Sequence, residues 1–396
     1  MDGPSPGIRR SAANPSGRAD LDRRHFLILV GSAAAYSALN PALTWARRLD
    51  QPSRLQPWRL PAELPANTAD AARALIGAAV LAPSDWNTQP WRFEVEENHI
   101  RIVADVRRAL PVTDPDRRGL MAALGAALEN LLVAARGYGV HPNVLYFPQG
   151  PASPVVADMT WTPGDLRRDR ALFESLPLRR TNRREYDGRA IFPENRVQLV
   201  AQSSEDVQIH WLDGRDRVRA FAGLAHDATR QQMRDARAEA EQYSWMRFDG
   251  EEKRRGDGVP VSALAVGPLT ELMASRYFNP RSMFLRFGVD AAGDQARDQV
   301  RTAGALALFT VSKRAEPQWV LGGQTYERFC LKATQLGIAH QTMSAPLENA
   351  NIREHVLAAF GAGGSEPLAL VRLGHAKPVD SVPRRAVALV SSFRNA

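Results

Sequence analysis

The sequence predicts an α+β protein built from two similar halves. Apolar residues recur at helical spacing in some segments and alternate with polar residues, as in strands, in others. Residues 125–140 also align without gaps on residues 323–338, an offset of 198, with glycine, glutamate, alanine and a second glycine coinciding. Two explanations are open: chance similarity between two core helices, or an internal duplication in which each half is one α+β unit.

The first half is expected to span residues 67–170. Thr68 is a plausible N-cap for its first helix, and Gly139 is a natural end for its second. The expected elements are a helix, two strands around a turn, a long apolar helix and a strand, at 67–82, 91–104, 117–139 and 144–147.

The second half is expected to span residues 171–396. Its polar, proline-containing and aromatic segment at 240–290 is interpreted as a lid. The other expected elements are a strand, an amphipathic helix, a strand, a helix and a late strand, at 207–212, 216–245, 305–312, 320–337 and 369–374.

The composition is that of a globular protein. The chain has 396 residues, of which 44% are hydrophobic and 24% charged, and this excludes intrinsic disorder as the main state. Cys330 is the single cysteine, so an intramolecular disulfide framework and a cysteine-rich zinc site are excluded. The net charge is +8, but basic residues alternate with acidic ones along the chain and no nucleic-acid-binding motif accompanies them. We expect no nucleic-acid partner, and no metal site, since the eight histidines form no HxxxH pair.

Residues 1–46 have the features of an export signal. Arg23 and Arg24 precede an apolar run at 26–39, which is shorter than the ~20 residues that cross a bilayer. The paired arginines, a spacer and Phe-Leu resemble the twin-arginine signal, although Asp22 stands where Ser or Thr is commoner.

We therefore expect the twin-arginine export machinery to be a partner, cleavage after Ala46, and a periplasmic or exported protein. An uncleaved membrane anchor and a buried or amphipathic N-terminal helix are the alternatives. The proline-rich residues 47–66 are expected to form a linker.

A polar loop carries the strongest local motif. Residues 82–93 read APSDWNTQPWRF, and two prolines fix the backbone between a helix and a strand. The residues alone leave open an ordinary loop or a rigid hydrogen-bonding surface for a heteroaromatic ring. The motif resembles that of the nitroreductase superfamily of FMN-dependent oxidoreductases. The resemblance implies that Pro83, Ser84, Asn87 and Gln89 lie against a flavin.

An arginine-rich segment carries the second motif. Residues 178–186 read LRRTNRREY, which alone is either a solvated basic run or a phosphate site, because a phosphate needs guanidinium groups and a hydroxyl donor. It resembles the Arg-Arg-Ser/Thr-x-Arg motif of the same superfamily. The resemblance implies that Arg179, Arg180, Thr181 and Arg183 bind the FMN phosphate, ribityl chain and pyrimidine edge.

Two later segments extend the resemblance. Residues 345–349 read APLEN and are similar to a flavin-binding Pro-Ile-Glu-Gly loop, which implies contacts from Pro346 and Glu348. Arg384 and Arg385 resemble a C-terminal basic contact to phosphate.

In ordinary nitroreductases the arginine motif comes before the polar loop, and two identical subunits build two sites. Here the order is inverted, and each motif occurs once. The arrangement is similar to the Acg-type branch with fused repeats. It implies a nitroreductase-like fold, in which two fused half-units form an intramolecular pseudo-dimer with one FMN site at the junction, and a monomer is plausible.

The expected function is that of an FMN-dependent oxidoreductase of nitroreductase type. The flavin N5 would pass electrons from NAD(P)H, or another donor, to a small nitro-aromatic or quinone-like acceptor, and no catalytic protein nucleophile is needed. There is no Gly-x-Gly-x-x-Gly after a strand, so NAD(P)H would be a transient donor. The alternative is an exported, non-enzymatic protein that binds or sequesters FMN, in which Trp245, Tyr277 or Phe278 fills the site.

Overall fold

The computed structural model of the chain describes residues 58–164, 170–248, 250–265 and 284–394. The predicted export signal and most of the predicted linker lie outside these residues, so the structure does not test them. The same holds for residues 266–283 of the predicted lid, which include Tyr277 and Phe278.

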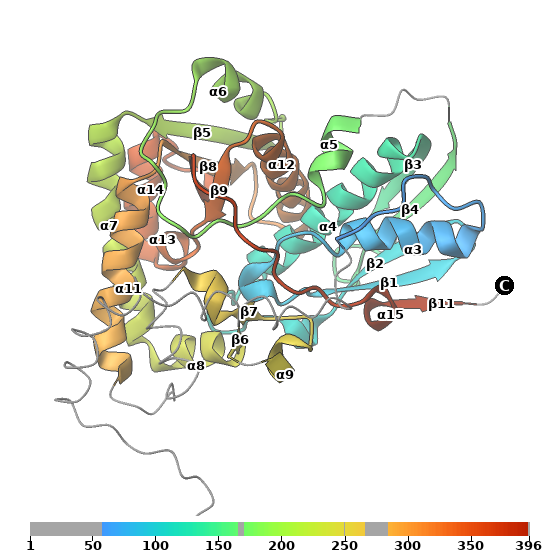
Figure 1. Cartoon of the computed structure of the whole chain (residues 1–396), viewed down its shortest axis with the longest axis horizontal. Coiled ribbons are helices and arrows are strands. Elements are labelled where there is room, and N and C mark those ends of the chain that lie inside the picture. Colours follow the sequence, from blue (N-terminus) through green and yellow to red (C-terminus); the bar gives the residue numbers. More distant parts are fainter. Residues whose placement is uncertain (1–57, 165–169, 249, 266–283, 395–396) are drawn as a thin grey trace, which may run out of the picture.

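The described residues form two larger sheets with a central pair of helices between them, and a third sheet of two short strands, which confirms the predicted α+β class (Figure 1). The first sheet has the order β11-β1-β2-β4-β3 and the second the order β5-β8-β10-β9. Their strands are β1 (Trp91–Glu96), β2 (His99–Ala104), β3 (Val140–Tyr146), β4 (Val155–Pro163), β5 (Val207–Asp213), β8 (Ala305–Val311), β9 (Ala339–Thr342), β10 (Glu366–Gly374) and β11 (Ser391–Phe393).

The two sheets share one topology. In each, the first two strands in sequence are neighbours, the fourth lies beside the second, the third is at the edge, and all these pairs are antiparallel. A long helix joins the second strand to the third in both cases, namely α4 (Arg118–Gly137) and α12 (Glu316–Gln335). The first sheet gains β11 from the C-terminal end of the chain, which pairs parallel to β1.

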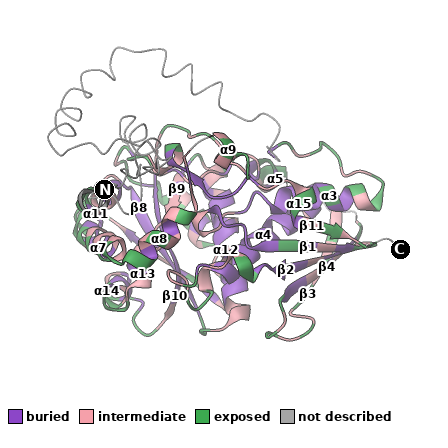
Figure 2. Cartoon of the chain, turned by 90° about the horizontal axis from the view of Figure 1, so that it is seen from below, coloured by how far each residue is buried: buried purple, intermediate pink, exposed green. Residues whose placement is uncertain are grey.

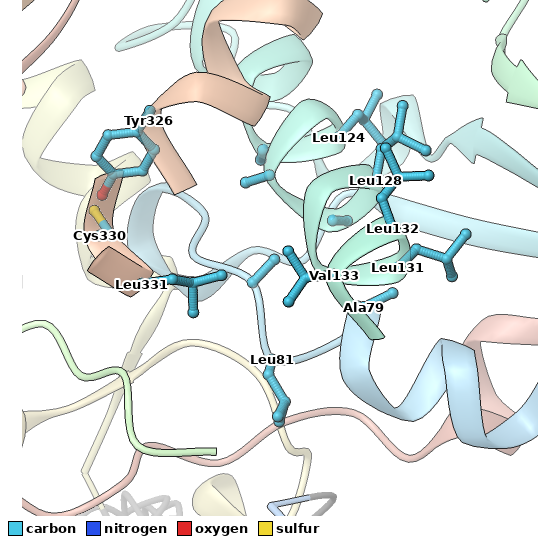
Figure 3. Close-up of a cluster of buried hydrophobic side chains, with 14 of the residues drawn as sticks. Ala79, Leu81, Leu124, Leu128, Leu131, Leu132, Val133, Tyr326, Cys330 and Leu331 are labelled. Atoms are coloured by element: carbon cyan, nitrogen blue, oxygen red, sulfur yellow. The ribbon is translucent and has the colours of Figure 1, made fainter. Parts of the chain in front are cut away.

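The central helices α4 and α12 approach each other closely because two glycines lie where they meet. A Cβ atom on Gly125 would lie 2.0 Å from the carbonyl oxygen of Val320, and one on Gly323 would lie 2.1 Å from that of Ala122. The two contacts are reciprocal, because the same offset of 198 relates both pairs of positions. Apolar side chains from both helices extend this core, among them Leu124, Leu128, Tyr326, Cys330 and Leu331 (Figure 3).

Helix α4 is long and apolar enough to cross a membrane by composition, but most of it is buried inside the described protein. Figure 2 shows buried residues concentrated in the sheets and central helices, with exposed positions on the outer helices. Composition alone therefore does not distinguish this core helix from a spanning one.

Smaller elements surround the sheets and the central helices. The first half contains α3 (Thr68–Ala79), η1 (Asp85–Asn87) and η2 (Val106–Arg108), and α5 (Arg170–Ser175) begins at its last residue. The others are α6 (Pro193–Val200), α7 (Arg215–Arg234), α8 (Ala236–Ser244), β6 (Met246–Arg247), α9 (Gly250–Lys253), β7 (Val259–Pro260), η3 (Val261–Leu264), α11 (Phe284–Arg301), α13 (Ala345–Glu348), α14 (Ala350–Phe360) and α15 (Val387–Val390).

Several predicted boundaries were wrong for local reasons. The N-cap of α3 is Asn67, whose side chain accepts a hydrogen bond from the Asp70 backbone, rather than Thr68. The predicted helix at 216–245 is two helices, because the Asp235 side chain accepts from the first backbone N–H groups of α8 and starts a new helix there. Strand β4 was not predicted.

We predict that Gly125→Ala lowers the free energy of unfolding by about 3 kcal/mol, because the new methyl group meets a backbone carbonyl that cannot move alone. The matched control is Gly223→Ala in α7, where a Cβ atom meets nothing within 4 Å. It should be neutral or stabilising by about 0.5–1 kcal/mol. Urea unfolding of both variants checks this, and equal effects would contradict the proposed close contact.

Candidate functional site

A cleft that is open to solvent at its mouth lies beside α4 at the junction of the two halves. One wall of the cleft is formed by small residues on α4, and loops from both halves form its other walls. Its lining includes Pro83, Ser84, Asp85, Trp86, Asp114, Arg118, Gly119, Ala122, Ala123, Ala126, Thr181, Arg183, Tyr326, Thr342, Leu347 and Glu348.

A second pocket, of about 460 Å³, adjoins the cleft. Pro83, Ser84, Thr181 and Arg183 line both spaces. The rest of the second pocket is lined by Trp58, Asn87, Arg179, Arg180, Val259, Asp380, Val382 and Arg384, and we call it the arginine pocket. The structure therefore brings the first motif, the second motif and the C-terminal arginine together, although they are far apart in sequence.

Two of the guanidinium groups in the arginine pocket are almost fully buried. Arg179 is 2% exposed, and its Nε lies 3.1 Å from Oε1 of Glu327, while Nη2 donates to the Leu81 carbonyl. Arg384 is 3% exposed, and it donates to Asn87 Oδ1 at 2.8 Å and to the Leu81 and Ala82 carbonyls. These bonds hold both side chains in place from the loop that follows α3.

The arginine pocket has an excess of positive charge. Burial lowers the pKa of Arg384 well below its usual value, and the neighbouring Arg179 and Arg180 lower it further. Burial and Arg179 likewise lower the pKa of Arg180 to about 10. Arg179 Nη1 and Arg384 Nε are buried and have no hydrogen-bond partner among the described residues. Buried donors of this kind require an acceptor, so the pocket fits an anion with several oxygen atoms.

The loop between α3 and β1 has an unusual backbone. Trp86, Asn87 and Gln89 have φ angles of 49°, 54° and 52°, in the left-handed region that non-glycine residues seldom adopt. Strain of this kind persists only where surrounding contacts fix it, and it is concentrated at functional sites.

Two amide side chains supply those contacts. Asn87 Nδ2 donates to the Gly258 and Pro383 carbonyls, and Gln89 Nε2 donates to the Gly256 carbonyl at 2.8 Å. Gln89 Oε1 accepts from the Arg385 backbone. Both amide side chains that were predicted to bind flavin are thus hydrogen-bonded to backbone groups.

Three predicted site residues line neither the cleft nor the arginine pocket. Gln89 is completely buried, Arg385 donates to the Gln89 and Leu389 carbonyls, and Pro346 is buried in the short helix α13. Their placement gives them supporting roles around the loop and α13. The other nine predicted residues all line the cleft or the arginine pocket.

The sequence analysis missed the acidic side of the cleft. Burial raises the pKa of Asp85, and the nearby Arg118 and Arg183 partly oppose this increase. Burial and the nearby Asp85 raise the pKa of Asp114 to about 6, although its oxygens accept from the first backbone N–H groups of α4. The same two causes raise the pKa of Glu348 to about 7. Asp85 stands inside the polar loop motif, so its position, but not its burial, was visible in the sequence.

The described part of the predicted lid lies against the polar loop, where Asn87 and Gln89 donate to Gly258 and Gly256, and against the segment after β2. Glu241 on α8 accepts hydrogen bonds from the Val112 and Thr113 backbone, and Asp257 pairs with Arg108 and with Arg247. The guanidinium carbon of Arg108 lies 5.0 Å from the ring centroid of Trp245. Trp245 does not line the cleft.

No family model matches this chain. The chain is 28% identical over 341 residues to "Putative NAD(P)H nitroreductase" of Mycobacterium tuberculosis strain H37Rv, which covers 81% of this chain and 91% of that protein. It is 26% identical over 333 residues to a second protein of that name, acg, from the same strain, covering 81% and 95%. This similarity supports the resemblance of the two motifs to the nitroreductase superfamily.

Among solved structures, an FMN and NADPH-dependent nitroreductase from sphigopyxis sp. strain HMH overlaps 57% of this chain and 99% of that chain, at 18% identity and a TM-score of 0.38. This overlap is too loose to say anything about the site.

We predict that Glu348→Gln raises the free energy of unfolding at pH 8 by about 1–2 kcal/mol. This value is reduced because the Glu348 side chain is partly exposed. The folded protein keeps the Glu348 proton up to about pH 7, whereas the unfolded chain releases it near 4.5. Stability from this group is therefore lost as pH rises between those values, and glutamine removes the loss.

Thermal unfolding at pH 4.5 and pH 8 measures this difference. The two proteins should converge at the lower pH. Glu354→Gln, on the exposed surface of α14, is the matched control and should show no such pH dependence. A constant difference between Glu348→Gln and the parent at both pH values would refute the assignment.

Proposed function

We propose that this chain is an FMN-dependent oxidoreductase of nitroreductase type. The arginine pocket, continuous with a cleft walled by small residues, is the observation that carries the proposal. An elongated ligand with an anionic end and a flat body matches this shape. The names of the curated relatives support the same class of activity.

The residues present fit FMN on structural grounds. Arg179, Arg180 and Arg384 would hold the phosphate, because two of them have buried donor atoms without acceptors. Thr181 and Arg183 line both spaces and would contact the ribityl chain and the pyrimidine edge. When bound, FMN would supply two-electron transfer through its N5 atom.

The chain's own residues would orient the ring and exclude water from one face. Gly119, Ala122, Ala123 and Ala126 leave the surface of α4 flat, because their side chains extend little beyond the backbone. A positive Arg183 beside the pyrimidine edge would favour the reduced, anionic form of the ring. Glu348 holds a proton near neutral pH and lines the same cleft.

The same layout leads us to propose one site in each chain. The polar loop belongs to the first half and the arginine segment to the second, and the shared sheet topology with the reciprocal glycine contact supports an internal duplication. The expected stoichiometry is one FMN per chain. Export by the twin-arginine route stays a prediction, since its motif lies outside the described residues.

We predict that Arg180→Ala weakens FMN binding by about 10- to 100-fold, because a guanidinium–phosphate hydrogen bond is lost. Arg196→Ala is the matched control: Arg196 also faces a tryptophan ring, Trp211, at 5.9 Å, but on the outer surface. It should bind FMN as the parent does. Quenching of flavin fluorescence during titration measures both, and equal affinities would exclude the arginine pocket as the phosphate site.

The decisive experiment for the proposed function is anaerobic. The chain is purified, loaded with FMN and mixed with NADPH or NADH, and the flavin absorbance is followed. Bleaching that reverses on adding a nitro-aromatic compound or a quinone supports the oxidoreductase. Bound FMN that stays oxidised with both nucleotides, yet is reduced by dithionite, would favour the FMN-sequestering alternative. Failure to bind FMN would reject both.

A further inference from the structure

Trp58 lies in the segment that the sequence analysis interpreted as a linker, yet it packs into the protein core. Its side chain is 8% exposed and belongs to the apolar cluster that also contains residues of α3 and α4. Trp58 also lines the arginine pocket. The segment before α3 therefore contributes a wall to a pocket that both halves build.

Two guanidinium groups lie against the Trp58 ring. The guanidinium carbon of Arg180 lies 3.9 Å from the ring centroid, and that of Arg384 lies 5.2 Å away. The two positive guanidinium groups repel each other, and their attraction to the electron-rich face of the indole offsets part of this repulsion. Trp58 thus contacts two of the four arginines that line the arginine pocket.

The indole N–H of Trp58 is a third buried donor without an acceptor. Its Nε1 atom has no hydrogen-bond partner among the described residues, and neither have Arg179 Nη1 and Arg384 Nε. All three residues line the same pocket. A buried N–H without a partner is costly, and all three belong to residues of one pocket, which favours a ligand with several acceptor oxygens.

We propose that Trp58 is a ligand of the anion in the arginine pocket, donating its indole N–H to a phosphate oxygen while its ring face holds Arg180 and Arg384. The chemistry is that of a phosphate monoester or free phosphate. The proposal rests on the proposed function only in taking the bound monoester to be FMN.

The test is Trp58→Phe, which keeps an aromatic face for the guanidinium groups and removes the N–H donor together with the five-membered ring. Titration calorimetry measures the binding of FMN, of riboflavin, which lacks the phosphate, and of inorganic phosphate. We expect the variant to bind FMN about tenfold more weakly. Riboflavin affinity should stay within about twofold, and binding of inorganic phosphate should fall with that of FMN.

Trp319→Phe is the matched control. Trp319, at the start of α12, is 5% exposed and its Nε1 atom is also buried without a partner, but it lines neither the cleft nor the arginine pocket. It reports what the loss of a buried indole does to the fold alone. We expect it to bind all three ligands as the parent does.

Each result separates the two proposals. Equal weakening of FMN and riboflavin in Trp58→Phe, or no weakening of FMN, would overturn the role of Trp58. If the parent binds FMN no more tightly than riboflavin, the phosphate assignment in the proposed function fails. In that case weaker binding of inorganic phosphate by Trp58→Phe alone would still support the Trp58 site.

Discussion

The contact between α4 and α12 sets the geometry of the whole molecule. Because Gly125 and Gly323 have no side chains, each helix backbone lies directly against the other, and the two sheets are held on either side. The polar loop begins beside α4 and the arginine segment runs beside α12. Residues of α4 and Tyr326 of α12 both line the cleft, so this helix contact also helps to shape the site.

The second constraint is the burial of positive charge. Arg179 and Arg384 lie within the protein at a considerable desolvation cost, which Glu327 and the backbone carbonyls after α3 offset only in part. Those same carbonyls belong to the strained loop, so the loop conformation and the arginine geometry stabilise each other. The remaining unpaired donors indicate that the pocket is built for a bound anion rather than for stability alone.

The sequence was informative where chemistry is local. The prolines of the polar loop, the Arg-Arg-Thr segment and the spacing of core helices predicted the α+β class and nine of the residues that line the cleft or the arginine pocket. It was silent where a role depends on distant backbone. Asn87 and Gln89 bond to segments near residues 257 and 384, which no local pattern relates to them.

The same limit explains the residues that were missed. Asp85 is an unremarkable position in the motif until the fold buries it beside Asp114 and Glu348. Trp58 follows proline-rich sequence, and only its packing against the arginines distinguishes it from a linker residue. In each case the side chain acquires its importance from neighbours that are distant in sequence.

The pairing of β11 with β1 has a consequence for how the chain reaches this structure. Phe93 and Val95 lie near the start of the described chain, and their partners Ser391 and Phe393 lie at its end. Strand β1 therefore has an open edge until β11 has been made, and contacts between residues so distant in sequence form slowly. Folding of the first sheet is therefore completed only after β11 has been made and can pair with β1.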